Sequence, residues 1–102
     1  MTYEECQLDA LGDATRRGIL AHLRRGPLPV GELAGRFPVS RPAISQHLRI
    51  LKEAQLVTDV PAGTRRLYAI NPAGFRALRD YFDQFWGTAL TEFRKRVETT
   101  DL

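Results

Sequence analysis

The stretch SRPAISQHLRILKEAQLV, residues 40–57, carries side chains that could read another molecule. Ile44, Leu48 and Leu51 recur at steps of four and three, which places them on one stripe of a helix facing a core. The other side offers directional hydrogen-bonding groups, namely Arg41, Ser45, Gln46, Arg49 and, at its edge, His47. An amide such as that of Gln46 can pair bidentately with adenine, and an arginine with guanine or phosphate. This pattern favours a helix that contacts base edges in the major groove of DNA.

The elements that must position this helix follow from caps, breakers and periodicity. Residues 3–11 and 14–25 predict two helices, the second capped by Asp13 and stopped by Gly26-Pro27. A short third helix is expected over residues 30–37, and Ser40 caps the fourth. Residues 56–60 and 65–70 predict two strands joined through 61–64, and Asn71-Pro72 opens a last helix. The expected fold is mainly α with a small β-hairpin, in the order α-α-α-α-β-β-α of a winged helix-turn-helix.

Composition and charge also favour a small domain with a polyanionic partner. A chain of 102 residues with 43% hydrophobic content has room for one compact domain. Residues 13–66 hold ten Arg and Lys against four Asp and Glu, whereas residues 1–12 carry three acidic groups and no basic one. A basic centre of this kind indicates a polyanionic partner on one face. The chain lacks an apolar run long enough to span a membrane and a basic N-terminal signal, so we expect a cytoplasmic protein.

The last helix carries a long apolar stripe. Phe75, Leu78, Phe82, Phe85, Trp86, Ala89, Leu90, Phe93 and Val97 recur at threes and fours over more than six turns. Because a domain this small fills its own core with other residues, the aromatic surplus predicts a dimer interface.

Three segments together resemble the ArsR/SmtB family of bacterial transcriptional repressors. They are LGDATRRGILAHL, PLPVGELAGRFPVSRPAISQHLRILKEAQLV and GTRRLYAINPAGFRALRDYFDQFW, and they cover nearly the whole chain. The resemblance implies a homodimer that binds a palindromic operator and blocks transcription until an inducer weakens binding. It also implies a single domain over residues 1–102, with the helix-turn-helix at 29–54, the wing at 56–70 and dimerisation helices at 1–12 and 71–99.

The site residues predicted on this basis form two sets. The expected DNA contacts are Ser40, Arg41, Pro42, Ser45, Gln46, His47, Arg49, Lys52, Arg65 and Arg66. The expected dimer contacts are Tyr3, Leu8, Phe82, Phe85, Trp86, Leu90 and Phe93.

Metal binding and catalysis find little support in the sequence. The family's thiol site needs a cysteine pair in the third helix, and its other common site needs histidines in the last helix; this chain has neither. Cys6, His22 and His47 are scattered over different helices, whereas zinc takes about four ligands. We therefore expect no metal, no cofactor and no catalytic residue. Open alternatives are a winged-helix module that binds RNA or a protein, and a repressor released by a small molecule or by oxidation of Cys6.

Overall fold

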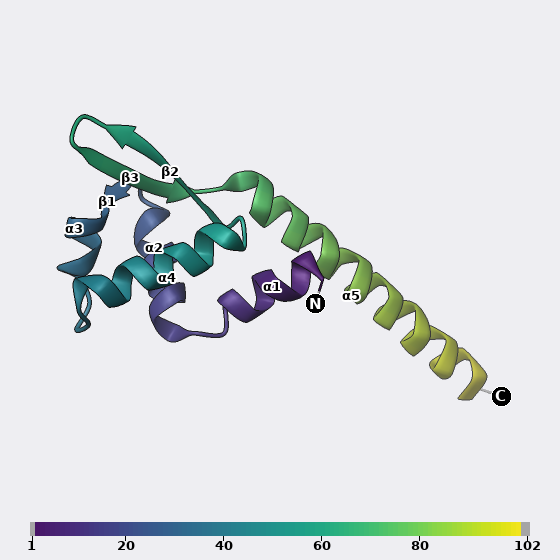
Figure 1. The fold of residues 1–102 in the computed structure, drawn as a ribbon. Coiled ribbons are helices and arrows are strands. Elements are labelled where there is room, and N and C mark those ends of the chain that lie inside the picture. Colours follow the sequence, from purple (N-terminus) through teal and green to yellow (C-terminus); the bar gives the residue numbers. More distant parts are fainter. Residues whose placement is uncertain (1, 101–102) are drawn as a thin grey trace.

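The computed structural model describes residues 2–100 as a small helical head with one long helix projecting from it (Figure 1). Its extents are 68 × 27 × 25 Å. The elements in chain order are α1 (Tyr3–Ala10), α2 (Ala14–Leu23), β1 (Leu28–Pro29), α3 (Val30–Ala34), α4 (Arg41–Glu53), β2 (Val57–Ala62), β3 (Arg65–Ile70) and α5 (Pro72–Thr100). The mainly helical winged helix-turn-helix expected from the sequence is therefore confirmed.

Side-chain caps begin α2 and α4 at the residues that the sequence predicted. The Asp13 carboxylate accepts a hydrogen bond from the Arg16 backbone N–H, and the Ser40 hydroxyl accepts one from that of Ala43. Thr2 and Glu5 cap the start of α1 reciprocally, each side chain accepting from the backbone N–H of the other residue. These caps satisfy backbone donors that the first turn of a helix leaves unpaired.

Three helices are shorter than the sequence predicted, and the first of them, α1, ends at Ala10 rather than at residue 11. Helix α2 ends at Leu23 rather than at residue 25, because Gly26, with a φ of +142°, turns the chain away. Helix α3 ends at Ala34, since Gly35 caps it and the chain leaves helical geometry before residue 37. None of these differences changes the order of α3 and α4, which form the helix-turn-helix.

The sheet has three antiparallel strands in the order β1-β3-β2, one more than the expected hairpin. β2 runs through Pro61 and Ala62, so Gly63 and Thr64 alone join it to β3. Gly63 has a φ of +65°, which suits this tight connection. The added strand β1 pairs Leu28 with Tyr68 across the other edge of β3. It spans two residues, too few for the alternation by which strands are recognised in a sequence.

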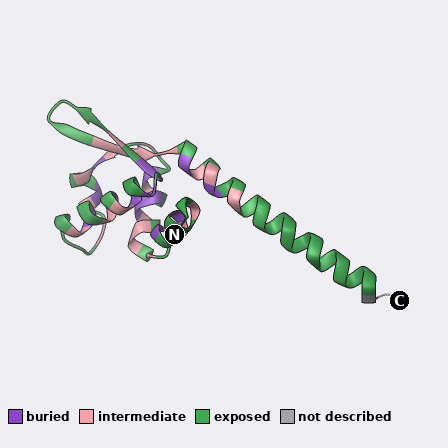
Figure 2. Ribbon diagram, turned by 45° about the vertical axis from the view of Figure 1, so that its right-hand side comes forward, coloured by how far each residue is buried: buried purple, intermediate pink, exposed green. Residues whose placement is uncertain are grey.

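The core lies among α2, α3, α4 and the base of the sheet. Its fully buried side chains are Ile19, Leu33, Ile44, Leu48, Leu51, Leu56, Gln7 and Val57. The three apolar residues used to predict the inner stripe of α4 are all 0% exposed, so that helix faces the core as expected. Figure 2 shows burial concentrated in the head and ending in the first turns of α5.

A close contact fixes where α5 leaves the head. Gln55 adopts a left-handed conformation (φ +62°) after α4, and its backbone carbonyl accepts a hydrogen bond from the Asn71 side chain at 2.9 Å. Gly74 packs against that carbonyl so closely that a Cβ there would lie 1.7 Å from the oxygen. The Gln7 amide donates to the carbonyls of Gly74 (2.8 Å) and Ala54 (3.3 Å), which ties α1 to the start of α5 and the end of α4.

Candidate nucleic-acid interface

Helix α4 separates two chemically different faces. While Ile44, Leu48 and Leu51 are buried, Arg41, Ser45, Gln46 and Arg49 are all exposed. Arg49 makes an ion pair of 3.7 Å with Glu53, one turn further along, and both side chains are largely exposed. Such a surface pair contributes less than about 1 kcal/mol, so an incoming phosphate or base can displace it. The exposed face is thus free to form directional hydrogen bonds with a partner.

The start of α4 places further predicted contacts at the surface. Ser40 and Pro42 are exposed, and Pro42 occupies the first turn, where its missing N–H costs no helical hydrogen bond. Lys52 lies at the other end of the helix, with its side chain half exposed.

The hairpin of β2 and β3 closes a groove with α3 and α4. The groove measures about 520 Å³ and contains the three guanidinium groups of Arg41, Arg65 and Arg66 against one carboxylate, that of Glu32. Arg65 and Arg66 are exposed, as expected for a wing. Arginines from two segments far apart in the sequence therefore converge on one opening, which is suited to an extended anion.

A buried carboxylate fixes the hairpin to α4. The side chain of Asp59, on β2, is only 4% exposed and contacts Lys52 Nζ at 2.6 Å and Arg66 Nε at 2.5 Å. Hydrogen bonds from Lys52 and then from Arg66 lower the pKa of Asp59 below its ordinary value. Two of the predicted DNA contacts thus share an intramolecular partner. Asp59 was not among the residues predicted from the sequence, because it lies opposite Tyr68 and only diagonal to Arg66, a relation that depends on the register of the hairpin.

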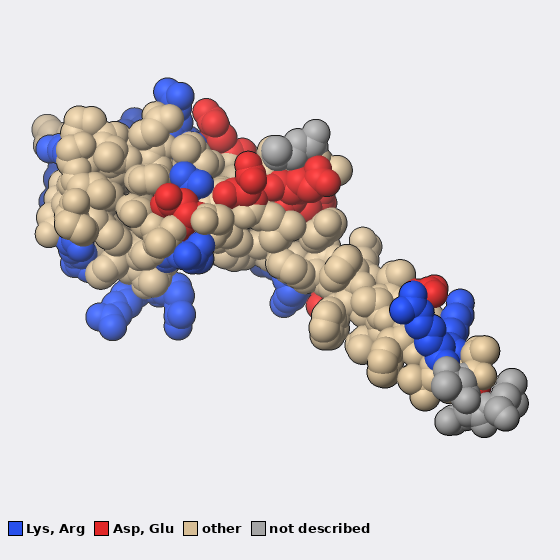
Figure 3. Space-filling model, turned by 90° about the horizontal axis from the view of Figure 1, so that it is seen from below, with Lys and Arg blue, Asp and Glu red and all other residues tan. Residues whose placement is uncertain are grey.

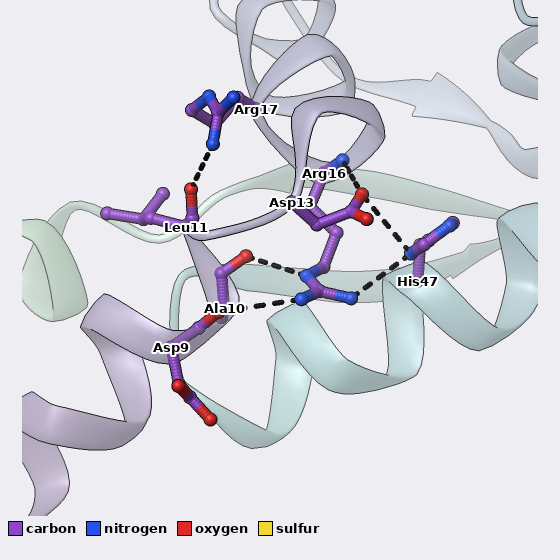
Figure 4. A network of polar contacts seen from close by, with 7 residues as sticks. All are labelled: Asp9, Ala10, Leu11, Asp13, Arg16, Arg17 and His47. Carbon is purple, nitrogen blue, oxygen red and sulfur yellow. Dashed lines mark hydrogen bonds and ion pairs between the residues drawn. The ribbon is translucent and has the colours of Figure 1, made fainter.

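His47 lies in a polar network between α4 and the N-terminal helices (Figure 4). Its Nδ1 accepts a hydrogen bond from Arg16 Nη1 at 3.3 Å and lies 3.9 Å from the Asp13 carboxylate. Arg16 Nε also donates to the Ala10 carbonyl at 2.6 Å, at the end of α1. The backbone hydrogen bond from Arg16 lowers the pKa of Asp13, and the nearby Arg16 charge acts in the same direction. The predicted DNA contact at His47 is therefore anchored by Arg16, a residue 31 positions earlier in the chain.

The head and α1 differ in the sign of their charge. Figure 3 shows basic side chains over the head and an acidic cluster beside the N-terminal helix. The first turn of α1 carries Glu4 and Glu5 and no basic residue. A polyanion would therefore be attracted to the α4 and hairpin side and repelled from α1.

The predicted dimer residues lie mostly on the surface. Tyr3 is 41% exposed and Leu8 is half-buried, whereas the aromatic and aliphatic residues of α5 are strongly exposed. They are Phe82 (46%), Phe85 (59%), Trp86 (62%), Leu90 (52%) and Phe93 (65%). Large apolar side chains so exposed on one helix indicate a surface that a partner covers.

Two other features concern metals and membranes. Within residues 2–100, no group of three or more His, Cys, Asp and Glu side chains is arranged to hold a metal ion. None of the helices in that range combines the length and apolarity that a bilayer crossing requires. Cys6 is exposed on α1.

Comparison with known proteins identifies relatives over most of the chain. A family model described as a helix-turn-helix domain matches residues 11–60. The HTH-type transcriptional regulator Rv2034 of Mycobacterium tuberculosis is 56% identical over 90 residues, which are 88% of this chain and 84% of that protein. The arsenical resistance operon repressor of Staphylococcus xylosus is 33% identical over 86 residues, covering 82% of this chain and 79% of its own length.

A solved structure shares the architecture. It is the homodimeric winged helix-turn-helix DNA-binding domain of Mb0332 from Mycobacterium bovis, described as a possible ArsR-family transcriptional regulator. It superimposes with a TM-score of 0.66 at 25% identity, and the alignment covers 85% of this chain and 78% of that one.

Proposed function

The chain belongs to the ArsR/SmtB family of DNA-binding transcriptional regulators, and on this premise we propose that it is a repressor that binds a palindromic operator as a homodimer. The family consists of regulators rather than enzymes. A repressor of this kind works in the cytoplasm, where the chromosome is.

The observation that carries the proposal is the exposed polar face of α4 beside an arginine-lined groove. In our proposal α4 lies in the major groove, where Gln46 and Arg49 contact base edges and Arg41 and Ser45 contact bases or phosphates. Ser40, Pro42 and His47 lie at the edges of this contact.

The hairpin supplies the second part of the interface. Arg65 and Arg66 reach the phosphates or the minor groove and contribute affinity that does not depend on sequence. Asp59 holds Arg66 and Lys52 together, so the hairpin and α4 approach the duplex as one unit.

The homodimer has independent support in the apolar face of α5 and in the homodimeric relative. A twofold axis relates two copies of α4, and two recognition helices in successive major grooves are about 34 Å apart. The proposed operator is therefore a palindrome whose half-sites are about one helical turn apart.

The test is a specificity measurement with one amide removed. We expect Gln46→Ala to cost about 1–3 kcal/mol on the operator, found by selection from random duplexes, and little on random-sequence DNA. Gln84→Ala removes the same side chain from α5 and is expected to leave both affinities unchanged. Equal losses on both DNAs would mean that Gln46 contacts only the backbone. Failure to enrich any duplex, with binding insensitive to salt, would favour a protein partner instead.

A further inference from the structure

The imidazole of His47 is held by Arg16 through one of its two ring nitrogens. Arg16 Nη1 lies 3.3 Å from His47 Nδ1. A guanidinium group carries donors only, so Nδ1 must accept this hydrogen bond, and the proton of the neutral ring lies on Nε2. Figure 4 shows the second ring nitrogen pointing away from Arg16 and Asp13. Within residues 2–100 this Nε2–H has no hydrogen-bond acceptor, so it is available to a partner.

Asp13 does not take the place of Arg16 as the partner of Nδ1. Its carboxylate lies 3.9 Å from Nδ1, beyond hydrogen-bond distance. The same carboxylate accepts a hydrogen bond from the backbone N–H of Arg16 at 3.0 Å. Because a proton on Nδ1 would face the guanidinium of Arg16, the ring in this arrangement is neutral and donates through Nε2 alone.

The guanidinium of Arg16 is itself held by the backbone. Its Nε donates to the Ala10 carbonyl at 2.6 Å, and its Nη2 donates to the Asp9 carbonyl at 3.5 Å. Both carbonyls belong to the last turn of α1. Since the guanidinium is planar, these two hydrogen bonds also set the direction of Nη1, and with it the orientation of the imidazole of His47.

The place of His47 on α4 decides which part of a DNA duplex its Nε2 can reach. At about 100° per residue, His47 lies about 100° from Gln46 and about 160° from Arg49 round the helix. It therefore lies on a flank of α4, beside the polar face, and its side chain is 21% exposed. A helix in the major groove has base edges in front of it and the phosphate backbone along its flanks. The acceptor within reach of this donor is therefore a phosphate oxygen.

Charge favours the same acceptor. Arg16 places a positive charge behind the ring, and its hydrogen bond to Nδ1 makes Nε2–H of His47 a stronger donor. A hydrogen bond to an ionised phosphate is in turn stronger than one to a neutral base. The carboxylate of Asp13 opposes the approach of an anion, and the guanidinium of Arg16 offsets it.

We propose that Arg16 is a positioning residue for DNA binding, which fixes His47 in the tautomer and orientation in which Nε2–H donates to a phosphate oxygen beside the major groove. The proposal rests on the DNA binding proposed above and adds one contact to it. Arg16 acts through His47 and does not itself contact the DNA.

The nitrogen chemical shifts of the histidine rings measure the tautomer in the free protein. The chain has two histidines, and His22 is an internal reference because its Nδ1 lies 3.2 Å from Arg36 Nη1. Both rings are expected in the Nε2–H form. Arg16→Met removes the donor to His47 and should give that ring a mixture of tautomers while His22 is unchanged. Arg36→Met is the matched control and should do the reverse.

Operator affinity separates a positioning role from a general loss of stability. We expect His47→Leu to bind the operator about tenfold more weakly, as for the loss of one hydrogen bond to a charged group. The amide nitrogen of Gln can stand in the place of Nε2, so His47→Gln should recover most of this loss. Arg16→Met should also weaken binding, but not in a chain that already carries His47→Leu, because both changes remove the same contact. Arg36→Met should bind like the parent chain.

A neutral methylphosphonate placed at each operator phosphate in turn locates the acceptor. At one position per half-site the substitution is expected to weaken the parent chain about tenfold and His47→Leu no further. If no phosphate shows this coupling, the acceptor is not a phosphate and the proposal is overturned.

The remaining outcomes separate this contact from DNA binding itself. A parental His47 spectrum in Arg16→Met, or a loss from Arg16→Met that persists beside His47→Leu, would overturn the proposal and leave the operator binding standing. Parental affinity of His47→Leu would overturn it as well. If Arg16→Met does not fold, the tautomer of the parent chain and the comparison of His47→Leu with His47→Gln decide the matter. A chain that enriches no duplex would overturn the proposed function, and this contact with it.

Discussion

Replacing Trp86 by Glu tests the proposed link between α5 and DNA binding, because none of the predicted DNA contacts lies on α5. The change places a carboxylate at the centre of the exposed apolar face, where Trp86 is 62% exposed in the protomer. We expect the dimer to dissociate and the affinity for the operator to collapse, although no DNA-contacting residue is altered.

The magnitude follows from the area that dimerisation would bury. With about 200 Å² for the side chain, the exposed part of Trp86 is roughly 120 Å², worth about 3 kcal/mol at about 25 cal/mol per Å². Two copies in the dimer make about 6 kcal/mol, which corresponds to roughly a 10⁴-fold rise in the dimer dissociation constant. The cost of burying an unpaired carboxylate adds to this value.

The assay combines sedimentation with operator titration at the same protein concentrations. The free energy of unfolding of the protomer is expected to change by less than about 0.5 kcal/mol, because Trp86 lies outside the core. Gln84→Glu is the matched control, since it adds the same charge to α5 on the side away from Trp86. We expect this variant to dimerise and to bind the operator like the parent chain.

Two results would refute the reasoning. A Trp86→Glu chain that is folded and monomeric, yet binds the full operator as tightly as the parent, would show that α5 does not couple the two half-sites. A variant that stays dimeric would show that the interface lies elsewhere.

Three further predictions concern the hairpin and the joint of α5. Neutralising Arg65 and Arg66 together is expected to reduce the slope of log DNA affinity against log salt concentration by about one to two per protomer. Titrations at several salt concentrations measure this slope. An unchanged slope would mean that the hairpin does not contact DNA. Asp59→Asn is expected to cost about 1–2 kcal/mol of unfolding free energy at neutral pH, a value reduced for the half-exposed Lys52 and Arg66. The folded-state pKa of Asp59 is lowered, so the loss of unfolding free energy should have its whole value above about pH 4, the pKa range of an unfolded Asp. The loss should disappear as the pH falls through the folded-state pKa. Denaturant titrations at several pH values measure it. Gly74→Ala is expected to destabilise the chain by about 1–3 kcal/mol in thermal melts, since its Cβ meets a backbone carbonyl, whereas an alanine in place of Gly87 has open space and should be neutral or slightly stabilising.

The helices were predictable because their signals are local. Asp13 and Ser40 are standard N-caps, and the periodicity of Ile44, Leu48 and Leu51 identified the face of α4 that is buried. Strand β1 was missed because its two residues acquire a strand conformation only by pairing with β3, a contact about 40 residues away in the sequence. The length of the hairpin was underestimated because Pro61 suggested a turn, whereas it lies on the edge strand β2, where proline is tolerated.

The residues of the candidate interface were predictable, but their partners were not. The exposure of Gln46 and Arg49 follows from the same periodicity that buries Leu48. By contrast, the contact of Lys52 and Arg66 with Asp59 joins a helix to two strands, and its existence depends on how the hairpin folds back on α4. The anchoring of His47 by Arg16 likewise joins residues 31 positions apart.

In the proposed dimer, the position of α1 explains how α5 can set the spacing of the two copies of α4. Gln7 is fully buried and donates to carbonyls at the end of α4 and at the start of α5, so it links the helix proposed to contact DNA to the helix proposed to dimerise. Arg16 makes a second connection, from the Ala10 carbonyl to His47 in the middle of α4. The proposed palindromic operator requires the two copies of α4 to keep a separation of about 34 Å. A tilt of α4 relative to α5 would therefore move both copies of α4 away from their major grooves. These few directional hydrogen bonds add to the packing in holding that angle, since a buried amide that loses its acceptors costs about 1–3 kcal/mol.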